Sequence, residues 1–238
     1  MEKLTLLYEG KAKKIYQTID EEFVLVEYKD DATAFNGEKK EQIIGKGRLN
    51  NEITSLLFSK LHVAGIKTHF IGKLSETEQL VKRVAIIPLE VVVRNVIAGS
   101  LSKRVGIEEG TELDRPIVEF YYKNDELGDP LLTEDHIDVL QIATKEQVSL
   151  LKEKALKINE VLLSYFLGLG IKLIDFKLEF GVTTEGDILL ADEISPDTCR
   201  LWDVQTNEKF DKDVFRRDLG SLTEAYTEIL HRLGGQIA

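Results

Sequence analysis

The stretch that decides the fold is Leu173-Ile-Asp-Phe-Lys-Leu-Glu-Phe180. Side chains alternate between the two faces of a β-strand, so this stretch separates charged from apolar residues. The charged face carries Asp175, Lys177 and Glu179, and the apolar face carries Ile174, Phe176, Leu178 and Phe180. The pattern therefore predicts a strand that covers a core with one face and presents a row of charges on the other.

A second strand is predicted over 187–193, directly after the turn residues Glu185-Gly186. If these two residues form the hairpin loop, Glu179 lies opposite Asp192, whereas a one-residue slip brings Glu193 opposite instead. Two facing carboxylates repel each other. A divalent cation would reverse that repulsion, and such oxygen ligands suit Mg²⁺ with a nucleotide phosphate completing the shell. The alternative interpretation is a solvated polar face on an antiparallel sheet.

The chain around this hairpin predicts further strands and two long helices. Thr144 and Gln147 have the spacing of a capping box, and an apolar stripe follows them, so the clearest helix covers 144–167. A final helix is expected over 214–233, after an irregular polar segment, 195–211. Further strands are expected at 89–97 and 116–123.

The first third of the chain predicts a smaller α+β lobe. One helix is expected over 47–64, with Gly65 at the position of a C-terminal glycine. Short apolar runs predict strands at 4–9, 14–18, 23–28, 67–74 and 79–83. We expect two lobes, 1–85 and 86–238, and no linker tract separates them, so a cleft between them is the natural place for a site.

The composition excludes several classes of protein. The 238 residues are 43% hydrophobic and include 31 Lys and Arg against 42 Asp and Glu, a formal net charge of −11. Such a chain can bury a core, and its charge argues against nucleic acid or an anionic membrane as a partner. The single cysteine, Cys199, favours a reducing compartment. No signal-peptide core or membrane-length apolar run is present, so a soluble cytoplasmic protein is expected.

Common catalytic motifs are absent from the sequence. It contains no Walker A motif, no dinucleotide-binding glycine motif, no G-x-S-x-G and no H-E-x-x-H. The four histidines are scattered without the spacing of metal ligands: His62, His69, His136 and His231. Zinc enzymes and serine or cysteine hydrolases are therefore disfavoured.

Three other segments carry groups suited to anionic ligands. The turn Gly10-Lys-Ala-Lys13 offers backbone amides and lysines to phosphates, although a lysine-rich hairpin tip is often only a soluble edge. In 93–104, Ser100 is placed to cap a short helix beside Arg94 and Arg104, which suits a phosphate or carboxylate, or merely a capped helix. The segment 192–203 combines acidic residues, Ser, Arg and the only Trp beside the candidate metal strand.

Taken together, these segments resemble the SAICAR synthetase family over residues 6–235. The resemblance is carried by Gly10-Lys-Ala-Lys13, Val93-Arg-Asn95 with Gly99-Ser100, Asp175-Phe-Lys-Leu-Glu-Phe-Gly181, Asp192-Glu193, Ser195-Pro-Asp197 and Arg200-Leu-Trp-Asp203. It implies a two-lobed α+β fold with a kinase-like ATP cleft and mainly antiparallel sheets flanked by helices. It also implies an ATP-dependent ligase that joins L-aspartate to the carboxylate of carboxyaminoimidazole ribotide (CAIR), and a homo-oligomer, expected to be a dimer.

The resemblance also implies roles for individual residues. The turn Lys11-Ala12-Lys13 would hold the ATP phosphates, helped by Lys82 and Lys123. Glu179 and Asp192 would hold Mg²⁺, and Lys177 would neutralise charge at the reacting groups. The ribotide would be bound by Arg94, Ser100 and Arg200, with Asp197 on a ribose hydroxyl. Asp175 or Asp129 would accept a proton from the attacking amine.

Two alternatives to the ligase remain. A small-molecule kinase could use the same ATP cleft, and ADP release would then need no amino acid. A catalytically silent nucleotide-binding regulator would lack at least one of the charged groups named above, and none is missing.

Overall fold

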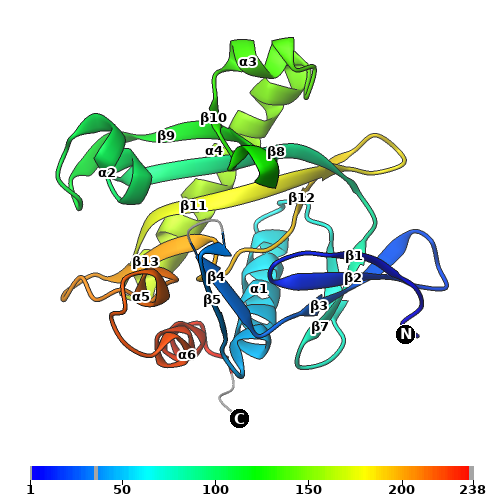
Figure 1. Ribbon diagram of the computed structural model, residues 1–238, viewed down its shortest axis with the longest axis horizontal. Coiled ribbons are helices and arrows are strands. Elements are labelled where there is room, and N and C mark those ends of the chain that lie inside the picture. The colour runs from blue at the N-terminus through cyan, green and yellow to red at the C-terminus, as the bar shows by residue number, and fades with distance from the viewer. Residues whose placement is uncertain (1, 35–36, 236–238) are drawn as a thin grey trace.

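The computed structural model describes residues 2–34 and 37–235, and Figure 1 shows their arrangement. The N-terminal part forms an antiparallel sheet in the order β1-β2-β3-β7-β6. Its strands are β1 (Leu6–Glu9), β2 (Lys13–Gln17), β3 (Phe23–Tyr28), β6 (Phe70–Lys73) and β7 (Glu78–Lys82). Helix α1 (Lys46–Val63) packs against this sheet, and β4 (Asp31–Ala34) pairs with β5 (Lys39–Gln42) as a separate ribbon.

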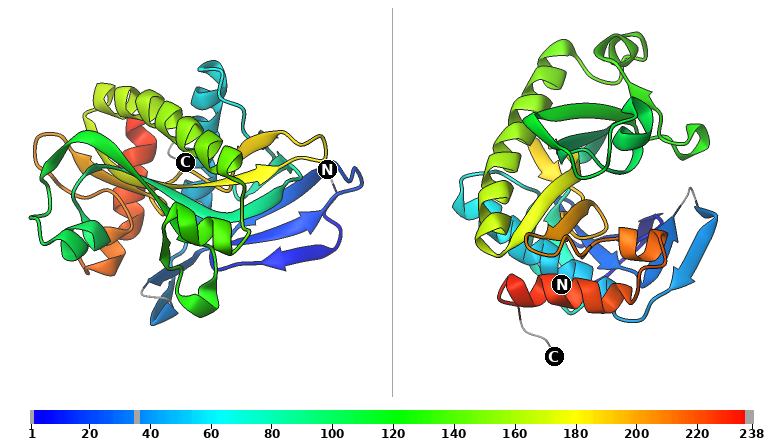
Figure 2. Two further views of the ribbon diagram at one scale, coloured as in Figure 1. Left: turned by 90° about the horizontal axis from the view of Figure 1, so that it is seen from above. Right: turned by 90° about the vertical axis from the view of Figure 1, so that its left-hand side faces the viewer.

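A second antiparallel sheet holds the decisive strand at its centre. Its order is β10-β9-β8-β11-β12, and β13 pairs with the other end of β11. These strands are β8 (Ala85–Val96), β9 (Glu112–Tyr122), β10 (Leu131–Leu132), β11 (Ile171–Val182), β12 (Ile188–Ala191) and β13 (Cys199–Asp203). Helix α4 (Lys145–Gly168) lies along one face of this sheet, which leaves the other face for the charged side chains of β11 (Figure 2).

The remaining helices are short or lie at the edges. They are α2 (Gly99–Val105), the 3₁₀ turn η2 (Asp125–Leu127), α3 (Glu134–Val139), α5 (Asp213–Arg216) and α6 (Leu222–Arg232). Helix α6 packs against α1, so the end of the chain returns to the N-terminal part. No helix among the described residues is long and apolar enough to cross a membrane.

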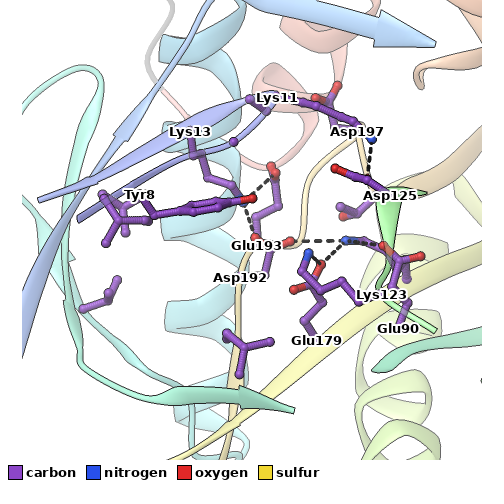
Figure 3. A pocket seen from close by; sticks show the side chains of 18 of the residues that line it. Tyr8, Lys11, Lys13, Glu90, Lys123, Asp125, Glu179, Asp192, Glu193 and Asp197 are labelled. Atoms are coloured by element: carbon purple, nitrogen blue, oxygen red, sulfur yellow. Dashed lines mark hydrogen bonds and ion pairs between the residues drawn. The ribbon is translucent and has the colours of Figure 1, made fainter. Parts of the chain in front are cut away.

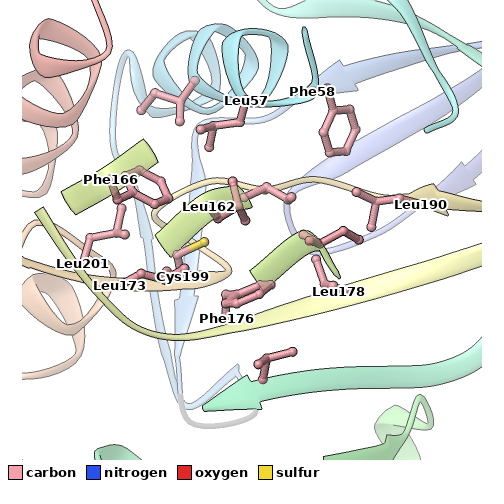
Figure 4. Close-up of a cluster of buried hydrophobic side chains, with 14 of the residues drawn as sticks. Leu57, Phe58, Leu162, Phe166, Leu173, Phe176, Leu178, Leu190, Cys199 and Leu201 are labelled. Atoms are coloured by element: carbon pink, nitrogen blue, oxygen red, sulfur yellow. The ribbon is translucent and has the colours of Figure 1, made fainter. Parts of the chain in front are cut away.

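One large core joins the two halves of the chain. Figure 4 shows Leu57 and Phe58 of α1 in one cluster with Leu162 and Phe166 of α4, and Phe176 of β11 lies on the side away from α1. All five side chains are almost completely buried. Cys199 lies in the same cluster, and burial raises the pKa of its thiol, which leaves it a packing residue.

The sequence-based expectations for the long elements are confirmed. The α+β class with antiparallel sheets is correct, and helix α4 begins after a capping box formed by Thr144 and Gln147. Helix α1 ends before Gly65, whose φ of 79° is the left-handed conformation expected after a helix.

Three expectations were wrong in detail. The predicted final helix is two helices, α5 and α6, separated by residues 217–221, which include Gly220 with a φ of 148°. The segment expected to be irregular contains strand β13, which pairs with β11. Ser100 does not cap α2, because the helix begins at Gly99 and the N-cap is Ala98.

The hairpin register also differs from the prediction. Val182 pairs with Ile188, so the connection is longer than two residues and Glu179 lies opposite Ala191 instead of Asp192. Neither Asp192 nor Glu193 belongs to β12, because Asp192 adopts a φ of 58° and turns the chain out of the strand.

Candidate functional site

A cavity of about 650 Å³ lies between the first sheet, strand β11 and the segment after β12. Figure 3 shows charged side chains entering it from three directions: Lys11 and Lys13 from the first hairpin, Glu179 from β11, and Asp192 from the segment that follows β12. Residues far apart in sequence therefore face one space.

Lys177 is the centre of the charged network. Its Nζ lies 2.5 Å from Glu179 Oε1, 3.3 Å from Glu90 Oε1 and 3.4 Å from Asp192 Oδ2. Glu90 is the residue directly opposite Glu179 across the β8–β11 pair. Burial opposes the charge of this lysine, but the three carboxylates raise its pKa well above the ordinary value. The ammonium of Lys177 thus occupies the position where several carboxylates converge.

Two further lysines complete this network. Lys13 donates to Asp192 and, at 2.8 Å, to Glu193 Oε1, while Lys123 lies 2.9 Å from Glu179 Oε1 (Figure 3). Although burial alone would raise it, the charges of Lys13 and Lys177 hold the pKa of Asp192 below its usual range. Asp192 is therefore ionised at neutral pH while these ammonium groups stay in place.

These carboxylates suit a divalent cation that is only partly bound by protein. Glu179 and Asp192 both contact one ammonium, so one small cation can reach both. Among residues 2–34 and 37–235, no three Asp, Glu, His or Cys side chains are arranged to hold a metal ion. Mg²⁺ is commonly bound by one or two carboxylates together with substrate phosphates, so this donor set fits Mg²⁺.

The first hairpin and its neighbours place more ammonium groups around the cavity. Lys11 pairs with Asp125 at 2.7 Å, and Lys82 pairs with Glu185 at 3.1 Å. Both pairs are partly exposed, so they are weak and can open for an anion. Ala12 also lines the cavity.

An apolar part of the cavity was missed by the sequence analysis. It is formed by one face of the first sheet, by Val84 and by the start of β8, and its side chains are Ile15, Val24, Val26, Val81, Val84 and Ile86. The alternation of apolar residues along these strands predicted an apolar face of the sheet. It did not show that part of this face would line a cavity instead of being covered by other side chains. An apolar surface beside ammonium groups is suited to a nucleotide base.

The candidate ribotide residues form a second cluster on the same face of β11. Asp175 receives Arg94 Nη1 at 2.8 Å and Arg200 Nη1 at 2.9 Å, and Arg94 Nη2 donates to Ser100 Oγ at 3.2 Å. A Cβ on Gly99, whose φ is 54°, would lie 2.4 Å from Arg200 Nη2. These residues do not line the cavity itself; they lie beside it along β11.

The remaining predicted residues lie at the cavity rim. Asp129 lines the cavity with a φ of 49°, and its carboxylate accepts the backbone N–H of Asn124 at 2.9 Å. The side chain of Asp197 is 4% exposed, and its Oδ2 lies 2.6 Å from Lys46 Nζ and 3.6 Å from Lys212 Nζ.

Several cavity residues had no signal in the sequence analysis. They are Glu90, Lys212, Arg216 and His69, whereas Glu193 had been named only as an alternative partner of Glu179. His69 had been interpreted as an ordinary histidine. It is buried with Nε2 3.2 Å from the carbonyl oxygen of Asp192, and burial lowers its pKa to about 4. It is therefore neutral at pH 7 and contributes no charge.

Comparisons with known proteins place the chain in one family. The family model for SAICAR synthetase matches residues 6–233. A phosphoribosylaminoimidazole-succinocarboxamide synthase of Bacillus cereus (strain G9842) is 74% identical over 235 residues, covering 99% of this chain and 98% of that protein.

Solved structures agree with that assignment. A synthase of the same name from Ehrlichia chaffeensis has a TM-score of 0.95 and 51% identity, covering 98% of this chain and all of that chain. A SAICAR synthetase in complex with ADP has a TM-score of 0.94 and 53% identity, covering 97% and 98% of the two chains. By model, sequence and structure, this chain belongs to the SAICAR synthetase family.

Proposed function

We propose that the cavity joins L-aspartate to the carboxylate of CAIR, with ATP consumed and SAICAR, ADP and phosphate released. Membership of the family makes the chain an ATP-dependent ligase of purine biosynthesis. The observation that carries the proposed chemistry is the convergence of Lys13, Lys177 and Lys123 on Glu179 and Asp192 in one cavity. Such a centre binds and neutralises phosphates, which is what phosphoryl transfer requires.

The reaction proceeds through an acyl phosphate in this proposal. A carboxylate is a poor electrophile because oxide would have to leave. Transfer of the γ-phosphoryl group from ATP to a CAIR carboxylate oxygen releases ADP and creates a better leaving group. The amine of aspartate then attacks the acyl carbon, the C–N bond forms, and the C–O bond to phosphate breaks. Lys177 lies where it can neutralise charge on the transferring group.

The chain's residues hold the nucleotide in two ways. Lys11, Lys13 and the backbone at Ala12 bind the phosphates, with Lys82 and Lys123 beside them. Glu179 and Asp192 would hold Mg²⁺, which would supply positive charge to neutralise the phosphates of the nucleotide.

The arginine cluster holds the ribotide. Arg94 and Arg200 share Asp175, so their guanidinium groups are fixed in direction and can bind a phosphate or carboxylate with paired hydrogen bonds. Ser100 adds a hydroxyl, and Asp197 has acceptor capacity left for a ribose hydroxyl.

Asp129 and Asp175 are the two candidates for the proton acceptor. Asp129 lines the cavity, whereas both oxygens of Asp175 already accept guanidinium N–H groups. The geometry favours Asp129 as the acceptor and gives Asp175 the task of orienting the two arginines.

Residues 1–85 form the ATP lobe and residues 86–238 the metal and ribotide lobe in this proposal. The protein acts as a cytoplasmic homodimer without nucleic-acid or membrane partners.

The test is ADP release from the purified protein with Mg²⁺-ATP and CAIR, with and without L-aspartate, while SAICAR is measured in parallel. ADP and SAICAR appearing together only with aspartate supports the ligase. ADP release that does not need aspartate supports a kinase, and ATP binding without any ADP release supports a regulator.

A further inference from the structure

A buried cluster around Asp197 has more positive charge than its carboxylate can neutralise. Lys46 Nζ lies 2.6 Å and Lys212 Nζ 3.6 Å from Asp197 Oδ2, and the Tyr226 hydroxyl donates to Asp197 Oδ1 at 2.5 Å. Arg216 lines the same cavity, and its guanidinium pairs with Asp213 at 2.7 Å. One carboxylate therefore faces two ammonium groups and a phenol.

The partners of Asp197 differ in their access to the cavity. The side chain of Lys46 is 0% exposed and Tyr226 is equally buried, and neither lines the cavity. The side chain of Lys212 is 14% exposed and does line it. Its backbone N–H donates to Pro196 O at 3.0 Å, which fixes Lys212 beside the segment that carries Asp197.

Lys46 is not placed where it stabilises its own helix. It is the first residue of α1, and a positive charge at a helix N-terminus is unfavourable. A fully buried ammonium there is tolerated only because Asp197 neutralises it. Burial and the neighbouring charges of Lys46 and Arg216 lower the pKa of Lys212, whereas Asp197 and Glu193 act in the opposite direction. The site thus favours a further anion next to Lys212.

We propose that Lys46 and Tyr226 are positioning residues that hold Asp197, and that they leave Lys212, with Arg216, to bind the carboxylates of the dicarboxylic amino-acid substrate. This inference rests on the proposed ligase function. Lys212 and Arg216 lie one helical turn apart at α5, so they present two cations on one side of the cavity. L-Aspartate carries two carboxylates and therefore matches this pair.

The experiment measures initial rates of SAICAR formation, varying each substrate in turn. In Lys212→Gln we expect the KM for L-aspartate to rise by about tenfold or more, as for a lost charge-assisted hydrogen bond, while the KM values for ATP and CAIR stay within about twofold. Lys212→Arg should recover most of the loss. Lys145→Gln, an exposed lysine at the start of α4, is the matched control and should behave as the wild type.

The positioning role has a distinct prediction. In Lys46→Met, Asp197 loses its buried cation and draws Lys212 toward itself, so the KM for L-aspartate rises although Lys46 lies outside the cavity. Tyr226→Phe should give the same change at smaller size, and it decides the matter if Lys46→Met does not fold. An unchanged KM for aspartate in Lys212→Gln, or a rise only for CAIR, overturns the proposal, as does an unchanged value in folded Lys46→Met. Wild-type protein that forms no SAICAR refutes the ligase function itself.

Discussion

Replacing Asp175 by asparagine separates an orienting role from a catalytic one. The carboxylate is buried between two guanidinium groups and accepts Arg94 Nη1 at 2.8 Å and Arg200 Nη1 at 2.9 and 3.0 Å. Asparagine keeps the shape but offers one acceptor oxygen, so its amide group must face one guanidinium. The variant therefore removes one charge-assisted contact and leaves two buried cations without their shared anion.

The expected loss of stability follows from these contacts. Breaking a buried ion pair costs about 3–5 kcal/mol, and one hydrogen bond to a charged group contributes about 1.5–3 kcal/mol. Arg94 keeps Glu119 and Arg200 keeps Asp213 as partners, so the lower end applies, about 3 kcal/mol. For a chain of this length, that corresponds to a fall in Tm of about 6–12 °C. The KM for CAIR should rise about tenfold, since the arginines lose their fixed direction.

Thermal unfolding and steady-state kinetics with varied CAIR measure both effects. Asp138→Asn, which replaces an exposed carboxylate on α3, is the control and should change neither. A general base contributes about 10²–10⁴-fold to the rate. A fall in kcat of that size, with Tm and the KM for CAIR unchanged, would refute the orienting role and identify Asp175 as the proton acceptor.

Three further predictions concern the metal ligands, a buried acid and a glycine. Glu179→Gln and Asp192→Asn should each raise the KM for Mg²⁺-ATP by about tenfold or more without unfolding the protein, measured by kinetics and circular dichroism; unchanged values in both would contradict the metal site. Burial raises the pKa of Asp211 to about 7, so the folded protein holds this proton more tightly than the unfolded chain. The resulting contribution to the free energy of unfolding is complete below pH 3.8 and is lost as the pH rises through 7. Asp211→Asn should therefore gain about 3 kcal/mol relative to wild type between pH 4.5 and 7.5 in urea unfolding, and a constant difference would contradict this. Gly99→Ala should raise the KM for CAIR, since its Cβ would collide with the guanidinium of Arg200.

Features that depend on the local pattern of residue types could be predicted from the sequence. The alternation along β11 predicted both its buried and its charged face, and the capping box predicted the start of α4. The short motifs near Gly10, Arg94 and Asp192 come from distant parts of the chain, yet the structure gathers them along one cavity and one strand. Local chemistry therefore predicted which residues matter better than it predicted how they meet.

The register of the site could not be predicted, because it depends on non-local pairing and on one unusual residue. The carboxylate directly opposite Glu179 is Glu90, which lies on β8 and is far away in sequence. Asp192 reaches Lys177 only because its left-handed backbone turns the chain out of β12. Aspartate tolerates that conformation better than most residues, but nothing in the sequence marks it.

The role of Lys46 was also missed by the sequence analysis. In the sequence it is a lysine directly before the predicted amphipathic helix, where exposure is the ordinary expectation. Its burial follows from the packing of α6 against α1, which brings Tyr226 and the Asp197 segment over the helix N-terminus. Only the tertiary arrangement makes this lysine part of the site.

The charge of the cavity differs from that of the whole chain, and this difference bears on how anionic substrates are bound. The chain has a formal net charge of −11, yet eight Lys and Arg side chains line the cavity against seven Asp and Glu. Most of these groups already pair with one another. An incoming phosphate or carboxylate can therefore replace a protein carboxylate as the partner of an ammonium group that is already in the cavity. Lys177 and Lys13 now neutralise Glu179 and Asp192, and a divalent cation arriving with the nucleotide would take over that task. Both lysines would then be free to face the transferring phosphoryl group, so metal binding and charge neutralisation at the reacting atoms are two consequences of one exchange.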